Sequence, residues 1–152
     1  VVLTKRAEHL WYHAGQISFP GGKLESYDSG FAEAAIREAK EEISLLPKSV
    51  KVVGGLSPVR SSTGFFVQPV VGIIARDILN NLDPDPAEVE SILTLPLAHI
   101  LCSKNFTWVT TQVNGREESF WVLAHAKHYI WGLSARVLND LRYRLSCSPT
   151  SP

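Results

Sequence analysis

Three carboxylates lie close together in one short run of the chain, REAKEEISL, at Glu38, Glu41 and Glu42. If this run is helical, Glu38 and Glu42 are one turn apart and Glu41 lies beside both. Carboxylate oxygens grouped in this way suit hard cations such as Mg²⁺ or Mn²⁺. A solvated acidic helix face has the same pattern, because like charges at this spacing repel by only about 0.2–0.5 kcal/mol per pair. The residues before the run must therefore distinguish the two interpretations.

A Pro-Gly-Gly turn precedes the acidic run, in the segment Phe19-Pro20-Gly21-Gly22. Glycine tolerates backbone conformations that other residues avoid, so such a turn can bring backbone N–H groups close to a ligand. A phosphate at the turn would then lie near the carboxylates of the following helix. The pairing favours a cation site that acts on a phosphate compound over a plain solvated helix face.

The helix that must position the carboxylates is predicted from Phe31 to Leu45, with Asp28-Ser29 and Gly30 supplying a turn and an N-cap. Its apolar side chains recur at helical spacing and form one stripe that would pack on a sheet. The members of this stripe are Ala32, Ala35, Ile36, Ala39 and Ile43. The three glutamates fall on a separate stripe, roughly 120° round the helix from the apolar centre.

The rest of the chain alternates strand and helix patterns without repeats, which predicts an α/β or α+β domain spanning residues 1–146, with a tail at 147–152. A strand at 1–5 is followed by a polar connection that reaches residue 18, and Asp77 to Glu90 forms a long acidic connection of a length that is often functional. Asn114-Gly115 indicates a hairpin turn. The other expected strands cover 50–59, with a bulge at Gly54-Gly55, 65–75, 106–112 and 118–125, and the other expected helices cover 96–101 and the segment from 131.

Composition limits the classes of partner. Of 152 residues, 45% are hydrophobic, and fifteen basic residues balance fifteen acidic ones. A net charge of zero gives no general attraction to nucleic acid or to an anionic membrane, and no apolar run reaches the ~18 residues of a membrane span. We expect a small-molecule substrate, no nucleic-acid or membrane partner, and a monomer or homodimer. Widely spaced Cys102 and Cys147 favour a reducing, cytoplasmic location.

The start of the sequence, VVLTKR, and the absence of methionine predict that the first strand is truncated. A targeting signal upstream of it, including an organellar one, stays possible.

The motif from Gly22 through Asp28 to the REAKEEISL run resembles the Nudix box, the signature of hydrolases that cleave nucleoside diphosphates linked to another group. The usual box has Glu at the Asp28 position, one residue fewer before the run, and Gly where Ser44 stands. Upstream, Leu3-Thr4, Arg6-Ala7, Gly15 and the FPGG segment resemble the additional motif of the coenzyme A diphosphatase branch. Trp11 stands where that motif has arginine.

The resemblance implies a Nudix-type α/β/α sandwich, with a mixed β-sheet between helices, and a divalent-metal-dependent hydrolysis of coenzyme A or its derivatives. The products would be 3′,5′-ADP and 4′-phosphopantetheine, or its acyl form. Glu38 and Glu42 would be the principal ligands of Mg²⁺ or Mn²⁺. Glu41 would be a further ligand or the group that activates water, and Arg37 would orient the glutamates.

Substrate contacts are expected from the glycine turn at Gly21 and Gly22 and from basic side chains. Arg6 is the strongest basic candidate because it lies inside the second motif, and Lys23 and Arg60 are the others. Each of the three could equally be a surface cation. Glu88, in the long acidic connection, is a candidate for a further carboxylate at the metals, although a solvated glutamate explains it as well.

Two other functions fit the residues. A Nudix diphosphatase that acts on ADP-ribose, a dinucleotide or a noncanonical nucleotide is favoured by the Trp11 mismatch. A nucleotide-binding module without catalysis is disfavoured by the intact set of Glu38, Glu41 and Glu42, since such a module has no need of a metal site.

Overall fold

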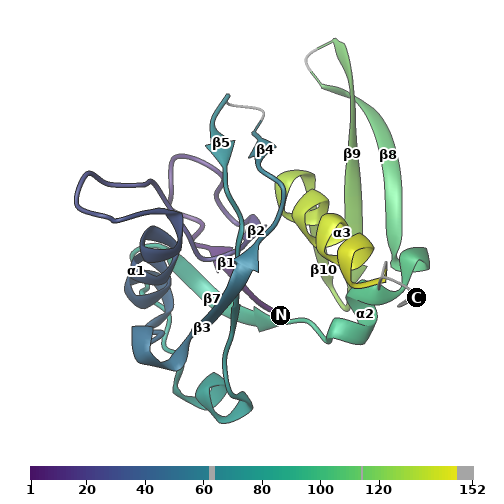
Figure 1. Cartoon of the computed structure of the whole chain (residues 1–152). Helices are drawn as coiled ribbons and strands as arrows, with labels where there is room; N and C mark the ends of the chain where they lie inside the picture. The colour runs from purple at the N-terminus through teal and green to yellow at the C-terminus, as the bar shows by residue number, and fades with distance from the viewer. Residues whose placement is uncertain (62–63, 114, 147–152) are drawn as a thin grey trace. The chain divides into compact units, whose positions relative to one another are not determined.

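The computed structural model describes residues 1–61, 64–113 and 115–146 of the chain. Its backbone separates into two compact units (Figure 1). One unit spans Val2–Thr94 and contains all of the predicted site residues, and we call it the carboxylate unit. The other begins at Leu95, also includes Val1, and is called the C-terminal unit.

The carboxylate unit is built on a three-stranded antiparallel sheet. The central strand β1 (Val2–Arg6) lies between β2 (Ile17–Ser18) and β7 (Val89–Thr94). The register between β1 and β7 shifts at Lys5/Arg6, so the ladder becomes irregular where β1 ends. Arg6 therefore pairs with Val89 beyond this irregularity, at the last position before the chain enters the connection to β2.

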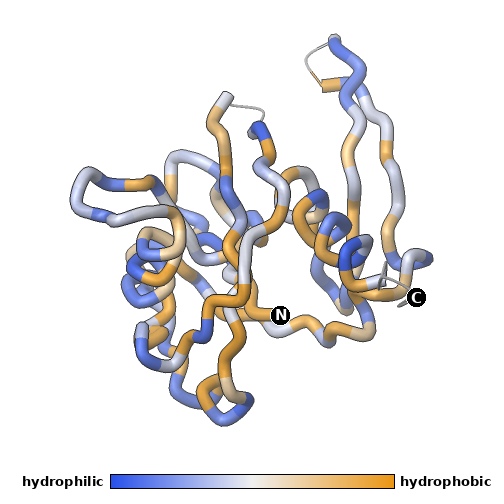
Figure 2. The backbone as a smooth tube through the Cα atoms, viewed as in Figure 1, coloured by the Kyte–Doolittle hydropathy of each residue, from blue (hydrophilic) through white to orange (hydrophobic). Residues whose placement is uncertain are grey.

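Helix α1 (Phe31–Ile43) supplies the carboxylates and packs by one face. Ala39 and Ile43 form a buried cluster with Leu45, against which partly buried apolar residues of the strands pack, including Val2 and Ile92. Polar and apolar segments alternate along α1 in Figure 2, as expected for an amphipathic helix. The predicted helix is confirmed, but it ends before Leu45.

The remaining strands of the carboxylate unit form two-stranded sheets, β3 (Lys51–Gly55) with β6 (Val70–Ile73) and β4 (Val59–Arg60) with β5 (Phe66–Val67). The 3-10 turns are η1 (Pro47–Ser49) and η2 (Arg76–Asn81). The prediction of one strand at 50–59 and one at 65–75 was wrong, because each of these segments is divided between two short strands. Pro69 has no N–H for a ladder and lies between β5 and β6, and the expected glycine bulge is present as a register shift between Val52 and Gly54.

The C-terminal unit contains a second three-stranded antiparallel sheet in the order β10-β9-β8. Helix α3 packs on β9, on β10 and on the short helix α2. The buried residues of this unit include Ile100, Leu123, Ile130 and Leu138. Its elements are α2 (Leu97–Leu101), η3 (Ser103–Asn105), β8 (Phe106–Val113), β9 (Arg116–His125), β10 (His128–Trp131) and α3 (Gly132–Ser146).

The α+β class is confirmed, and so are the helix after Pro96, the hairpin strands and the last helix. The single mixed sheet was wrong, because the described strands form four separate sheets in which all pairings are antiparallel. Strands β2, β7 and β10 were not predicted. Asn114 and the tail at 147–152 lie outside the described residues. No helix in the described part of the chain is long and apolar enough to cross a membrane.

Candidate active site

The three glutamates of α1 differ sharply in exposure. Glu42 is only 5% exposed, while the side chains of Glu38 and Glu41 are 16% and 58% exposed. The prediction of a separate carboxylate stripe was therefore wrong for Glu42, which is buried together with Ala39 and Ile43. Glu42 follows Ala39 by three positions, close to one helical turn, so it shares the packed side of the helix.

Burial leaves the Glu42 carboxylate in an unfavourable electrostatic setting. Its pKa is raised to about 7, first by burial and then by the like charges of Glu88 and Glu38. The positive charge of Arg6 and a hydrogen bond from the backbone N–H of Gly21 oppose this rise. The site thus gathers more negative charge than it neutralises, which is the condition under which a cation binds well.

Glu88 reaches Glu42 because the connection before β7 is tied to the last turn of α1. The N–H of Asp83 donates to the carbonyl of Ile43 at 3.2 Å, and the N–H of Asp85 donates to the carbonyl of Glu42 at 2.9 Å. These bonds satisfy carbonyl groups that a helix end leaves unpaired. They hold the exposed Glu88 near enough to raise the pKa of Glu42.

Arg6 is the predicted basic residue that the structure brings to these carboxylates. The connection that holds Glu88 is joined to the end of β1, where the Ala7 N–H donates to the Glu88 carbonyl at 2.9 Å. Arg6 lowers the pKa of Glu42 through its charge. Its Nε atom is buried and has no hydrogen-bond partner among the described residues. A buried N–H of this kind is costly to leave unpaired, so it is a donor suited to an anionic ligand.

Arg37 is the centre of a group of ion pairs on α1. Its Nε and Nη2 atoms donate to the two carboxylate oxygens of Asp28, both at 3.1 Å, and its Nη1 donates to Glu38 at 2.8 Å and to Glu41 at 3.3 Å. The guanidinium holds the pKa of Asp28 below its usual range, and the Asp28 side chain is 1% exposed. The sequence prediction gave Asp28 a part only in the turn and N-cap before the helix, and its place in the motif was the available signal for the pairing with Arg37. The N-cap position is Gly30, without a side-chain cap.

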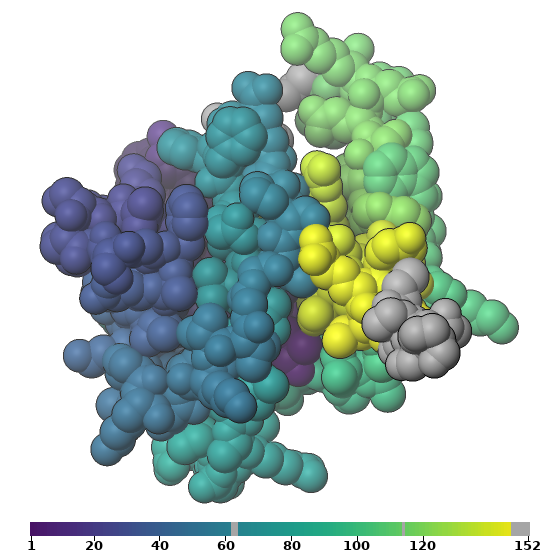
Figure 3. Space-filling view, viewed as in Figure 1, coloured from purple at the N-terminus to yellow at the C-terminus, as the bar shows by residue number. Residues whose placement is uncertain are grey.

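The glycine turn lies directly against the glutamates. A Cβ atom at Gly22 would overlap the Glu38 carboxylate, so only glycine leaves that carboxylate in place. Lys23 contributes its backbone carbonyl, which accepts a hydrogen bond from Arg37 Nη2 at 2.9 Å. Its side chain is exposed, as is Arg60 on β4. In the space-filling view, the dark-blue atoms belong to the segment that carries the glycine turn and α1 (Figure 3).

The donor set fits a hard divalent cation, although the carboxylates are not arranged around one. Within residues 1–61, 64–113 and 115–146, no three His, Cys, Asp or Glu side chains are positioned to hold a metal ion as they stand. Arg37 accounts for this, because it holds Glu38 and Glu41 in ion pairs. Cation binding would require these two carboxylates to turn from Arg37 toward Glu42.

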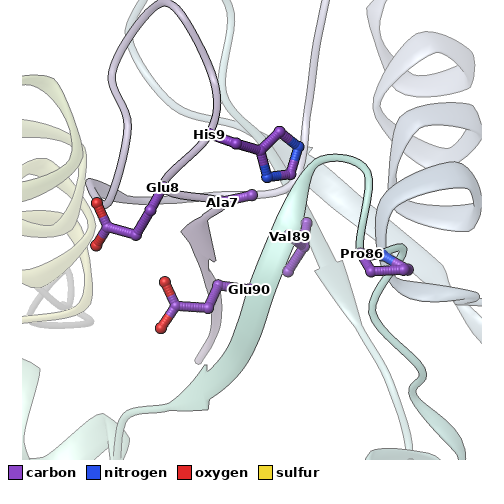
Figure 4. Close-up of a pocket in the computed structure, with 6 residues that line it drawn as sticks. All are labelled: Ala7, Glu8, His9, Pro86, Val89 and Glu90. Atoms are coloured by element: carbon purple, nitrogen blue, oxygen red, sulfur yellow. The ribbon is translucent and has the colours of Figure 1, made fainter.

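A cavity of about 420 Å³ opens beside the connection that carries Glu88, lined by residues on both sides of Glu88 and by the start of the β1–β2 connection (Figure 4). Glu8 and Glu90 line it, and Lys5 lies within 3.0 Å of both carboxylates. The two carboxylates outweigh the single positive charge of Lys5, so the cavity has no positive charge available to bind a phosphate. The lining residues are Ala7, Glu8, His9, Pro86, Val89 and Glu90.

Comparison with known proteins shows which proteins this chain resembles. Residues 1–113 match the model of the NUDIX domain. A protein of Salmonella paratyphi B named as the uncharacterized Nudix hydrolase NudL is 38% identical over 149 residues, which cover 98% of this chain and 77% of that protein. Proteins of the same name from Salmonella newport and Salmonella heidelberg match with the same identity and coverage.

Proposed function

The chain belongs to the Nudix hydrolase family, and on that premise we propose that it hydrolyses the diphosphate bond of coenzyme A or a coenzyme A derivative with Mg²⁺ or Mn²⁺. The observation that carries the proposal is the buried Glu42 beside Glu38 and Glu88, with Arg6 next to it. Water adds across the P–O–P bridge, so one phosphorus gains a hydroxyl group and the other keeps the bridging oxygen. The products are 3′,5′-ADP and 4′-phosphopantetheine.

Each residue has a distinct task in this reaction. Glu38 and Glu42 hold the cation, and Glu41 either joins them or takes the proton of the attacking water. The bound cation supplies charge neutralisation of the diphosphate and lowers the pKa of water. Without a cation, Arg37 holds Glu38 and Glu41 next to the site through the contacts described above, and it would release them to the cation. Arg6 offers its unpaired Nε to a phosphate oxygen.

The choice of coenzyme A rests on the motif from Leu3 to Gly22. This segment contains β1, the β1–β2 connection and the glycine turn, and the structure brings Arg6 and Gly21 from it to Glu42. The relatives are named as uncharacterized and do not distinguish between substrates. The substrate therefore has to be identified by experiment.

A second candidate is hydrolysis of another nucleoside diphosphate derivative, such as ADP-ribose, a dinucleotide or a noncanonical nucleotide. The observation that favours it is Trp11, which stands where the coenzyme A motif has arginine. The carboxylates and Arg6 would act in the same way on any of these compounds, because all share the diphosphate group.

The test is a hydrolysis panel with product identification by chromatography. Coenzyme A, acyl-coenzyme A, ADP-ribose and a dinucleotide are each incubated with Mg²⁺ or Mn²⁺. We expect 3′,5′-ADP from coenzyme A, and a loss of turnover of roughly a hundredfold or more in Glu42→Gln. Glu33→Gln, a change of the same kind on the same helix, should behave as wild type. Preferred turnover of another compound would support the second candidate, and no turnover of any compound with either metal would refute both.

A further inference from the structure

The connection between β1 and β2 presents two aromatic side chains to solvent. Trp11 is 97% exposed and Tyr12 is 80% exposed. Among the described residues, Trp11 has the highest exposure of any large apolar side chain. Tryptophan is usually well buried, and an indole in this position adds almost no apolar burial to the fold. Its surface is therefore available to a ligand.

Both ends of this connection meet at the candidate active site. The Gly15 N–H donates to the Arg6 carbonyl at 3.2 Å, and the Arg6 N–H donates to the Gln16 carbonyl at 2.9 Å. The Ala7 N–H is bonded to Glu88, as described above. The loop that carries Trp11 thus starts and closes at Arg6, which acts on Glu42.

The body of the loop is braced by side-chain contacts. Lys5 pairs with Glu8 at 3.0 Å, and His9 Nε2 is 3.1 Å from the carbonyl of Ala87. Figure 4 shows Glu8 and His9 on the chain as it leaves β1. His13 has a left-handed φ of 57°, a strained conformation for a residue other than glycine, and its Nδ1 is 3.1 Å from Gln16 Oε1. These contacts hold Trp11 on a formed loop, which lowers the entropy cost of binding.

The chain between Arg6 and Trp11 is short enough for one nucleotide to reach both residues. Trp11 follows Arg6 by five residues, so the two lie no more than about 18 Å apart even if the chain is fully extended. In a nucleotide, only the ribose separates the base from its first phosphate. A diphosphate at Arg6 and Glu42 therefore leaves the base within reach of the loop.

We propose that Trp11 is the stacking platform for the nucleobase of the substrate. The inference rests on the proposed function, because it takes the ligand to be a nucleotide whose phosphates lie at Arg6. Stacking uses the face of the base and tolerates any base, so Trp11 selects for the presence of a base and not for its identity. The part of the substrate beyond the diphosphate, on the side away from the base, makes no contact with Trp11.

The test compares two monophosphates that differ only in the base, AMP and ribose 5-phosphate, neither of which has a diphosphate bond to cleave. Dissociation constants are measured by calorimetry with Mg²⁺. Wild type should bind AMP roughly tenfold more tightly, the scale of one base–aromatic stack. Trp11→Ala should bind both compounds about equally, and Trp11→Phe should recover most of the difference. Trp108→Ala, which removes a half-exposed indole from β8, should match wild type.

A Trp11→Ala protein that keeps the full preference for AMP would overturn the proposal. So would a concentration-dependent dimer, measured by sedimentation velocity, that is lost in Trp11→Ala while AMP binding is unchanged, because Trp11 would then serve a second copy of the chain. Hydrolysis of coenzyme A by Glu42→Gln and by the Trp11 variants separates the two proposals. Turnover that depends on Glu42 but an AMP preference independent of Trp11 would remove only the stacking role.

Discussion

The Glu42 carboxylate is buried beside Glu88 and Glu38, so ionising it costs free energy in the folded protein. Its pKa of about 7 in the folded state exceeds the ordinary value of 4.5. The protonated form is therefore favoured by folding. The contribution of Glu42 to stability is most favourable below pH 4.5, falls as the pH rises toward 7, and is constant above that. A bound cation would reverse this penalty, so we infer that the residue is placed for binding at the expense of stability.

Replacing Glu42 with Gln should stabilise the metal-free protein at pH 8. The expected gain in the free energy of unfolding is on the order of 2 kcal/mol, because the shift in pKa corresponds to about 1.4 kcal/mol per unit and the site is partly solvated. At pH 4.5 the gain should nearly vanish, since the wild-type carboxyl group is then protonated. Urea unfolding in chelator at both pH values measures this. Equal stability of the two proteins at pH 8 would contradict the account of the buried charge.

Gly22 should be as sensitive as the ligands that it touches, although it lies at the surface. In Gly22→Ala the new Cβ atom would push the Glu38 carboxylate aside, and we expect Mn²⁺ affinity and turnover to fall by roughly tenfold or more. Gly30→Ala is the matched control, because a Cβ atom at Gly30 meets nothing within 4 Å. Circular dichroism should show both variants folded. Wild-type affinity in Gly22→Ala would show that the close approach has no functional role.

At the scale of elements, α1 ends at a residue in an unfavourable conformation. Ser44 adopts φ 56° and ψ 24°, and its N–H donates to the Lys40 carbonyl at 3.1 Å. Glycine is the residue that enters this left-handed region without strain, and it is the one the usual Nudix box has here. The predicted end at Leu45 missed this because Ser44-Leu45 has no glycine to mark the stop.

Ser44→Gly should therefore raise the free energy of unfolding by roughly 0.5–1 kcal/mol. The gain comes from removing the Cβ atom from a left-handed residue, so Ser44→Ala, which keeps that atom, should show none. Thermal unfolding of the three proteins gives the comparison. A Gly variant no more stable than the Ala variant would contradict the strained helix end.

The element that sequence reasoning read least well is the segment before and including β7. The acidic connection was expected to reach Glu90, but β7 begins at Val89. The run VESILT follows two prolines and a pair of acidic residues, so its strand character is hidden in a polar context. The arrival of Glu88 beside Glu42 depends on backbone bonds from Asp83 and Asp85, which carry no side-chain signal.

At the scale of the whole chain, the spacing of residues in the sequence predicted only those contacts of the site that form within one helix. Glu41 beside Arg37 follows from helical geometry, because the two residues are four apart. The contact of Glu38 with Arg37 does not, because neighbouring residues point to different sides of a helix. The burial of Glu42 does not, because it requires knowing what packs against α1. Short strands such as β2, with only two residues, are fixed by their partner and not by their own sequence. Contacts between distant segments thus account for most of the unpredicted part of the site.

At the scale of the whole chain we propose that three separate segments, the end of β1, α1 and the connection before β7, together make a cation site. Glu88 and Glu90 offer a matched pair for this claim. They are two residues apart, but Glu88 acts on Glu42 whereas Glu90 pairs with Lys5 at 2.8 Å. A cation site built from all three segments should feel the loss of Glu88 and not that of Glu90.

The most direct measurement is Mn²⁺ binding by electron paramagnetic resonance at pH 8 for wild type, Glu42→Gln, Glu88→Gln and Glu90→Gln. We predict that Mn²⁺ affinity falls at least about tenfold in Glu42→Gln, because this variant loses a metal ligand. In Glu88→Gln the affinity should fall by a smaller factor, because only a neighbouring negative charge is lost. Glu90→Gln should bind as wild type does. Wild-type Mn²⁺ affinity in Glu42→Gln would contradict the central claim that this buried carboxylate holds the metal.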